Sequence, residues 1–177
     1  TMKEIGIAYL GECNHSTKLT HNGEKNMLTY GIYLASSDAS NINVCPKSKM
    51  CRESCLVGSG YAKIDALAHN NKVLNARIIK TRLFFANRNL FMTLMIKEIN
   101  KAINKAKRLG MEFSVRLNCT SDINPTVFVY EGKNILELYP NVSFYDYTKV
   151  KSHWKVAEKY PNYYITFSRD GSKENEE

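Results

Sequence analysis

Strand-like and helix-like segments alternate along this chain, and their order constrains the fold more than any other feature. Four segments rich in β-branched and aromatic residues predict strands: 27–35, 113–118, 143–149 and 163–168. Helical patterns separate them, one over 62–108 in two or three pieces and one over 152–159. With a linker before 143–149, this is the order of parallel α/β proteins. The sequence therefore predicts an α/β fold, either a partial (β/α) barrel or an open, mostly parallel sheet with flanking helices.

One domain accounts for most of the chain. Its 177 residues, 44% apolar, suffice for a hydrophobic core, so residues 1–170 are expected to form a single α/β domain. Residues 11–26 predict a loop or irregular hairpin. Residues 171–177 contain three Glu and predict a disordered acidic tail. The hydrophobic segment 163–168 precedes this tail closely, so its edge would be exposed unless something covers it.

The first residues and the length of the apolar runs indicate where in the cell the protein is located. No apolar run approaches the about 18 residues of a transmembrane helix. The first residues also lack the apolar core of a signal peptide. We therefore expect a cytoplasmic protein that makes no membrane contact.

Positive charge is concentrated between residues 72 and 108, which hold ten Lys and Arg but one acidic residue, Glu98. Such a concentration permits a polyanionic partner, of which nucleic acid is the usual one. Solvated helix faces would give the same pattern. The candidate nucleic-acid-binding residues are Arg77, Lys80, Arg82, Arg88, Lys97, Lys101, Lys105 and Arg108.

The strongest local motif is a loop at residues 43–56 that carries Cys45, Cys51 and Cys55 in a C-x5-C-x3-C pattern. A loop can turn three such thiolates toward one centre, and its basic residues would favour the thiolate form. An odd number of cysteines, five, in a cytoplasmic chain also favours metal binding or reactivity over disulfides.

The spacing favours a 4Fe–4S iron–sulfur cluster with one iron open or otherwise ligated. Structural zinc usually has tighter and paired Cys spacings, so zinc is the alternative metal. Absence of any metal is a third possibility, because free cysteines often pack as small apolar residues. Cys119, at the end of the 113–118 strand, is a candidate fourth ligand, although a buried spectator thiol fits as well.

Polar residues also follow the predicted strands. Binding groups gather at the carboxyl ends of parallel strands. The residues expected there to bind a cofactor or substrate are Asn118, Asp122, Asp146, Lys149 and Arg169. A loop anchor or helix cap is the alternative for Asp122, and an ion pair is the alternative for Asp146 and Lys149. The four histidines show no mutual ligand spacing, and each is expected to be a surface or core residue.

Three ordered blocks resemble the phage gene-product-88-like proteins. They are Asn-Val-Cys-Pro at 43–46 with Cys51 and Cys55, Val-Arg-Leu-Asn at 115–118 with Thr-Ser-Asp at 120–122, and Phe-Tyr-Asp-Tyr-Thr-Lys at 144–149. The resemblance covers residues 29–169. It implies a cysteine loop after the first strand and a part-barrel similar to radical S-adenosylmethionine enzymes, with Cys45, Cys51 and Cys55 as cluster ligands.

The chain departs from those patterns in three ways. Radical enzymes usually have C-x3-C-x2-C, which this loop does not match. Position 119 is Cys where similar sequences tend to have Gly, and similar chains continue past the 163–168 strand, which implies a shortened form here.

Three functions follow as hypotheses. The first is a phage protein that binds an iron–sulfur cluster, with radical S-adenosylmethionine-like enzyme activity on a substrate that the sequence does not identify. The second is a basic, replication-associated nucleic-acid-binding protein with a structural metal. The third is an effector that binds a host protein.

Overall fold

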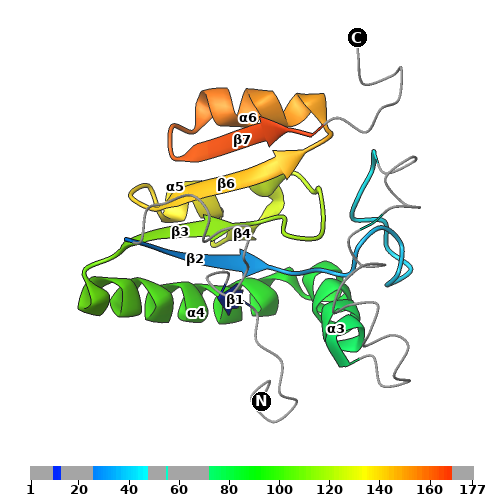
Figure 1. The fold of residues 1–177 in the computed structure, drawn as a ribbon. Coiled ribbons are helices and arrows are strands. Elements are labelled where there is room, and N and C mark those ends of the chain that lie inside the picture. The colour runs from blue at the N-terminus through cyan, green and yellow to red at the C-terminus, as the bar shows by residue number, and fades with distance from the viewer. Residues whose placement is uncertain (1–9, 13–25, 48–54, 56–71, 169–177) are drawn as a thin grey trace.

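The computed structural model describes residues 10–12, 26–47, 55 and 72–168 (Figure 1). Its main sheet has five strands in the order β1-β2-β3-β6-β7. These are β1 (Leu10–Glu12), β2 (Met27–Ile32), β3 (Glu112–Arg116), β6 (Ser143–Thr148) and β7 (Tyr163–Phe167). β1 runs antiparallel to β2, while β2, β3, β6 and β7 are parallel. The α/β prediction is confirmed as a mixed, mostly parallel sheet with flanking helices.

The first parallel strand ends earlier than predicted. β2 stops at Ile32 because the chain then turns away from the sheet toward a helix. The backbone N–H of Ala35 donates to Thr81 Oγ1 at 2.8 Å instead of pairing with a strand. The sequence predicts a loop or irregular hairpin at 11–26; β1 pairs antiparallel with β2, and residues 13–25 lie outside the described part.

The described part of the connection between β2 and β3 contains two helices, as the 62–108 pattern predicts. They are α3 (Lys72–Ala86) and α4 (Arg88–Leu109). Asn87 separates them and caps α4, accepting a hydrogen bond from the Leu90 N–H at 3.0 Å. Gly110 ends α4 with φ 64°, a left-handed conformation that glycine adopts without a Cβ penalty.

The predicted linker before β6 is wrong, because this segment contains four short elements. They are a 3₁₀ helix (Pro125–Val127), β4 (Val129–Tyr130), β5 (Lys133–Asn134) and α5 (Ile135–Leu138). Asn134 and Glu137 form a capping box at the start of α5. This short segment returns the chain to the position where β6 can pair parallel to β3.

The last crossover agrees with the predicted helix at 152–159. A 3₁₀ turn (Lys151–His153) leads into α6 (Trp154–Lys159), which packs against β7. The predicted tail at 171–177 lies outside the described residues.

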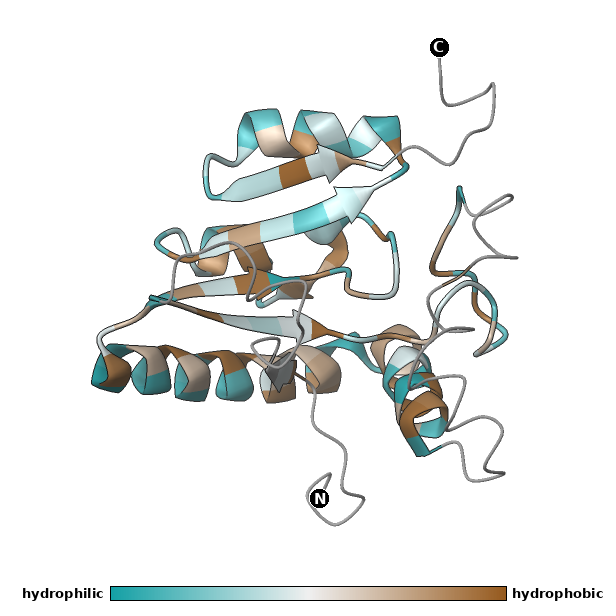
Figure 2. Ribbon diagram, viewed as in Figure 1, coloured by the Kyte–Doolittle hydropathy of each residue, from teal (hydrophilic) through white to brown (hydrophobic). Residues whose placement is uncertain are grey.

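The hydrophobic core lies on one face of the sheet. Alternate strand residues supply it, including Ile32, Val115, Phe144 and Tyr163. The helical elements complete it with Phe84, Phe91, Met95, Phe128, Ile135 and Val156. Hydrophobic and hydrophilic residues alternate along α4, so only one side of the helix joins this core (Figure 2).

Candidate functional site

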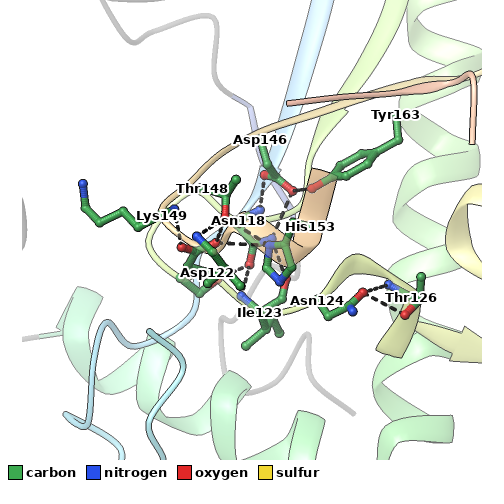
Figure 3. Close-up of polar contacts among 12 residues, drawn as sticks. Asn118, Asp122, Ile123, Asn124, Thr126, Asp146, Thr148, Lys149, His153 and Tyr163 are labelled. Carbon is green, nitrogen blue, oxygen red and sulfur yellow. Dashed lines mark hydrogen bonds and ion pairs between the residues drawn. The ribbon is translucent and has the colours of Figure 1, made fainter. Parts of the chain in front are cut away.

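Side chains from the carboxyl ends of β3 and β6 form a connected polar network (Figure 3). Its centre is Asp146 in β6, which is 2% exposed. The Asn118 backbone N–H donates to Asp146 Oδ1 at 2.6 Å, and Asn118 Nδ2 donates to Asp146 Oδ2 at 3.0 Å. Tyr163 Oη of β7 donates to the same Oδ2 at 3.1 Å. One buried carboxyl therefore joins three neighbouring strands.

Asn118 also shapes the loop that follows β3. Its Nδ2 donates to the Ile123 carbonyl at 3.0 Å. Its Oδ1 accepts from Ser121 Oγ at 2.8 Å and from the Ile123 N–H at 3.0 Å. Both the oxygen and the nitrogen of the Asn118 amide therefore form hydrogen bonds, and these bonds hold the loop at 118–123 together.

Burial controls the protonation of the central carboxyl. It raises the pKa of Asp146 to about 7, although the hydrogen bonds from Asn118 and Tyr163 and the charge of Arg116 act in the opposite direction. Burial, and next the charge of Asp146, raise the pKa of Tyr163 as well. The Asp146 carboxyl can therefore gain or lose a proton near neutral pH.

We expect this group to make stability depend on pH. Its pKa is higher in the folded chain than the 3.8 of an unperturbed Asp, so the native state binds more protons between these values. The stabilisation is complete below about pH 4 and is lost as the pH rises through about 7. Urea unfolding of wild type and of Asp146→Asn between pH 5 and 8 measures it. The wild type should lose more stability over this range than the variant, by on the order of a few kcal/mol. Parallel profiles would contradict the assignment.

A second group of contacts centres on Asp122. Its Oδ1 accepts from Thr148 Oγ1 at 2.6 Å, and its Oδ2 accepts from the Lys149 N–H at 2.8 Å. The ring of His153, also buried, places Nδ1 3.1 Å from Thr148 Oγ1 and 3.5 Å from Asp122 Oδ1. His153 lies in the interior of the described part of the structure. These contacts are those of a loop anchor, the alternative that the sequence offered for Asp122.

Lys149 extends the network to the end of β7. Its Nζ donates to the Ser168 carbonyl at 3.1 Å and to Ser168 Oγ at 3.0 Å. The Ser168 N–H in turn donates to the Thr148 carbonyl at 2.8 Å. Arg169, which the sequence placed in the same site, lies outside the described residues.

Cysteines lie at this edge of the sheet too. Cys45 Sγ accepts from the Ser37 N–H at 3.4 Å and lies 3.9 Å from the carbonyl oxygen of Thr120. Cys119 lies three residues after the end of β3, and its N–H donates to the Ile32 carbonyl at 3.1 Å. The Asp122 N–H donates to the Val44 carbonyl at 2.8 Å, which ties the cysteine loop to the loop after β3.

Arg77 of α3 lies close to two of the thiols. Burial lowers the pKa of this arginine, whereas the charges of Tyr33, Cys119 and Cys55 act to raise it. Cys45, Cys55 and Cys119 are half-buried. Within the described residues no group of three His, Cys, Asp or Glu side chains converges on one point, and Cys51 is outside that part.

The predicted basic residues differ in their exposure to solvent. Lys80, on α3, is buried, and burial lowers its pKa to about 8. Arg77 and Arg88 are half-buried, and Arg88 lies over the Phe84 ring. Lys97, Lys101 and Arg108 on α4 and Arg82 on α3 are exposed, and Lys105 is half-buried. The exposed charges that remain form a partial stripe along α4.

Sequence reasoning identified Asn118, Asp122, Asp146 and Lys149 from their positions after strands, and the structure brings them together. It missed Thr148, Ser121 and Tyr163, whose hydroxyls complete the hydrogen bonds. A signal for Tyr163 exists, since it begins the strand that the pattern places beside Asp146.

Comparison with known proteins identifies one family. A family model described as Gene product 88 matches residues 10–177. Neither the curated proteins nor the solved structures give a match. None of the helices in the described part is both long and apolar enough to cross a membrane.

Proposed function

The chain belongs to the Gene product 88 family of phage proteins, and we propose that it binds a 4Fe–4S cluster through Cys45, Cys51 and Cys55. The observation that carries the proposal is the position of Cys45. This sulfur is held at the carboxyl edge of the parallel sheet, where α/β proteins place their ligands.

The surroundings of the thiols fit a thiolate-bound centre. The Ser37 N–H already points at Cys45 Sγ, and such N–H···S bonds stabilise cluster thiolates and tune their potential. Arg77 supplies a permanent positive charge near Cys55 and Cys119, which offsets negative charge on the sulfurs. Zinc is the alternative metal for the same ligands.

Cys119 has two possible roles in this proposal. It precedes Thr120, whose carbonyl lies beside Cys45, so it could supply a fourth ligand. Its own sulfur lies 3.8 Å from the Arg116 carbonyl, which is the contact expected of a spectator thiol. A Cys119→Ser variant with unchanged metal content would assign the spectator role.

We assign positioning roles to Asn118, Asp122 and Asp146. Their polar atoms are engaged with one another and with the backbone, so these residues hold the loop at 118–123 in place beside Cys45. Lys149, bonded to Ser168, holds the ends of β6 and β7 together. A cluster at this edge would supply one-electron chemistry, and an open iron would permit S-adenosylmethionine to bind. Parallel strands in chain order with helices on one face also fit a partial (β/α) barrel.

Metal analysis of protein purified without oxygen tests the proposal. We expect a brown protein with about four irons and four sulfides per chain, bleached by dithionite. A colourless protein with one zinc would mean that the cysteines bind a structural zinc ion and not a cluster. A colourless protein without metal, after reconstitution with iron and sulfide has also failed, would overturn metal binding.

A further inference from the structure

The face of the sheet opposite the core carries a set of aromatic side chains. Alternation along β6 and β7 places Tyr145, Tyr147, Tyr164 and Thr166 there, because their neighbours Phe144 and Tyr163 belong to the core. The register agrees, since Tyr145 pairs with Tyr164 and Tyr147 pairs with Thr166. Both strands thus present tyrosines on the same side.

Two of these rings are open to solvent. Tyr147 is 48% exposed and Tyr164 is 59% exposed, whereas the same face is buried at Thr29 and Ser114 over β2 and β3. Tyr147 and Tyr164 are diagonal neighbours across the parallel strand pair, because Tyr164 pairs with Tyr145, two residues before Tyr147. The accessible surface is therefore an aromatic platform, defined by Tyr147 and Tyr164, with the half-buried Tyr145 between them.

A cation adjoins the platform. Arg116 of β3 pairs with Tyr145 in register, and its guanidinium lies 4.9 Å from the centre of the Tyr147 ring. Its Nε atom is buried and has no hydrogen-bond partner. In the described strands the carboxylate on this face is Glu112, at the opposite, amino end of β3. A positive group and two exposed rings are thus arranged side by side, and the charge of Arg116 also acts on the buried Asp146 carboxyl on the core face.

Planar rings beside an arginine match the chemistry of unpaired nucleotides. Bases of a single strand stack on exposed aromatic rings, and an arginine at the margin attracts the phosphates. In a duplex the bases are already stacked in pairs and cannot reach a flat sheet. The charge of the whole chain, +8, favours an anionic partner. Exposed tyrosines alone would also suit a protein partner, but the arginine beside them and the net positive charge favour a polyanion.

We propose that Tyr147, Tyr164 and Arg116 form a binding surface for single-stranded nucleic acid. This surface differs from the basic stripe of α4, which lies on the helix-covered side. It does not depend on the metal proposed for the carboxyl edge.

Fluorescence anisotropy with a labelled 15-nucleotide oligo(dT) at low salt tests the proposal on the full chain purified without oxygen. We expect binding that is stronger than to a duplex of the same length. Tyr147→Ala and Tyr164→Ala should each weaken it about tenfold, and Tyr147→Phe should retain it, because stacking requires only the ring.

Matched controls locate the surface. Trp154→Ala removes an aromatic of similar exposure, 55%, on α6 at the helix-covered side, and should leave affinity unchanged. The double variant Lys97→Gln and Lys101→Gln should reduce affinity far less than the tyrosine variants. Circular dichroism confirms folding of each variant. Absence of oligonucleotide binding, equal binding by the folded tyrosine variants, or equal loss with the Trp154 control would each overturn the proposal.

Discussion

Serine at Cys45, Cys51 or Cys55 is expected to abolish metal binding. Each substitution removes one thiolate of the proposed cluster, and metal binding and folding are coupled. A loss of about 3 kcal/mol of stability would lower the melting temperature by roughly 6–12 °C for a chain of this size. Iron analysis, the visible spectrum and a thermal melt of each variant measure the effect.

Two comparisons separate metal loss from a local packing effect. Cys13→Ser changes a cysteine outside the loop and should leave iron content and melting temperature unchanged. In Cys45→Ser, the hydroxyl can still accept the Ser37 N–H, so the variant should match metal-free wild type in stability. Four serine variants with identical iron content would show that the ligands are assigned wrongly.

Alanine at Asn118 should have the largest effect among substitutions outside the cysteine loop. It removes the side-chain hydrogen bonds to Ser121, Ile123 and Asp146, and it leaves the buried Asp146 Oδ2 with fewer donors. Unsatisfied buried groups cost about 1–3 kcal/mol each, so we expect a total of about 3–4 kcal/mol. Urea unfolding measures it.

Asn100→Ala provides the matched control. The Asn100 side chain is exposed and accepts one hydrogen bond, from Tyr139 Oη at 3.0 Å. Its replacement should cost less than about 0.5 kcal/mol. Equal losses for the two asparagines would mean that the network around Asp146 does not stabilise the fold.

The larger helices and strands could be predicted from the sequence because each is long enough to show a clear hydrophobic periodicity. The strands at 113–118 and 163–168 agree with β3 and β7 to within two residues at each end. The elements at 125–138 could not be detected in this way, since none exceeds four residues. The capping box of Asn134 and Glu137 is a sequence signal for α5 that was available.

The sequence predicted which carboxylate and amide residues belong to the candidate site. It did not predict the hydrogen bonds that these residues form. Parallel topology places Asn118 and Asp146 at the same edge, which sequence order alone can indicate. The burial of Lys80 could not be predicted from the positive charge of its side chain. Helical spacing does place it four residues before Phe84, on the side of α3 that enters the core. Counting positive residues therefore overestimated the accessible basic surface.

The contact between Cys45 and Thr120 has a consequence for how the protein matures. The two residues are 75 positions apart, and the long helices α3 and α4 lie between them. During synthesis, the edge that surrounds Cys45 is incomplete until β3 has left the ribosome and paired with β2. Parallel pairing over such a separation is slow compared with helix formation. The proposed cluster would therefore be inserted after the sheet has closed, because the edge that surrounds Cys45 is complete only then.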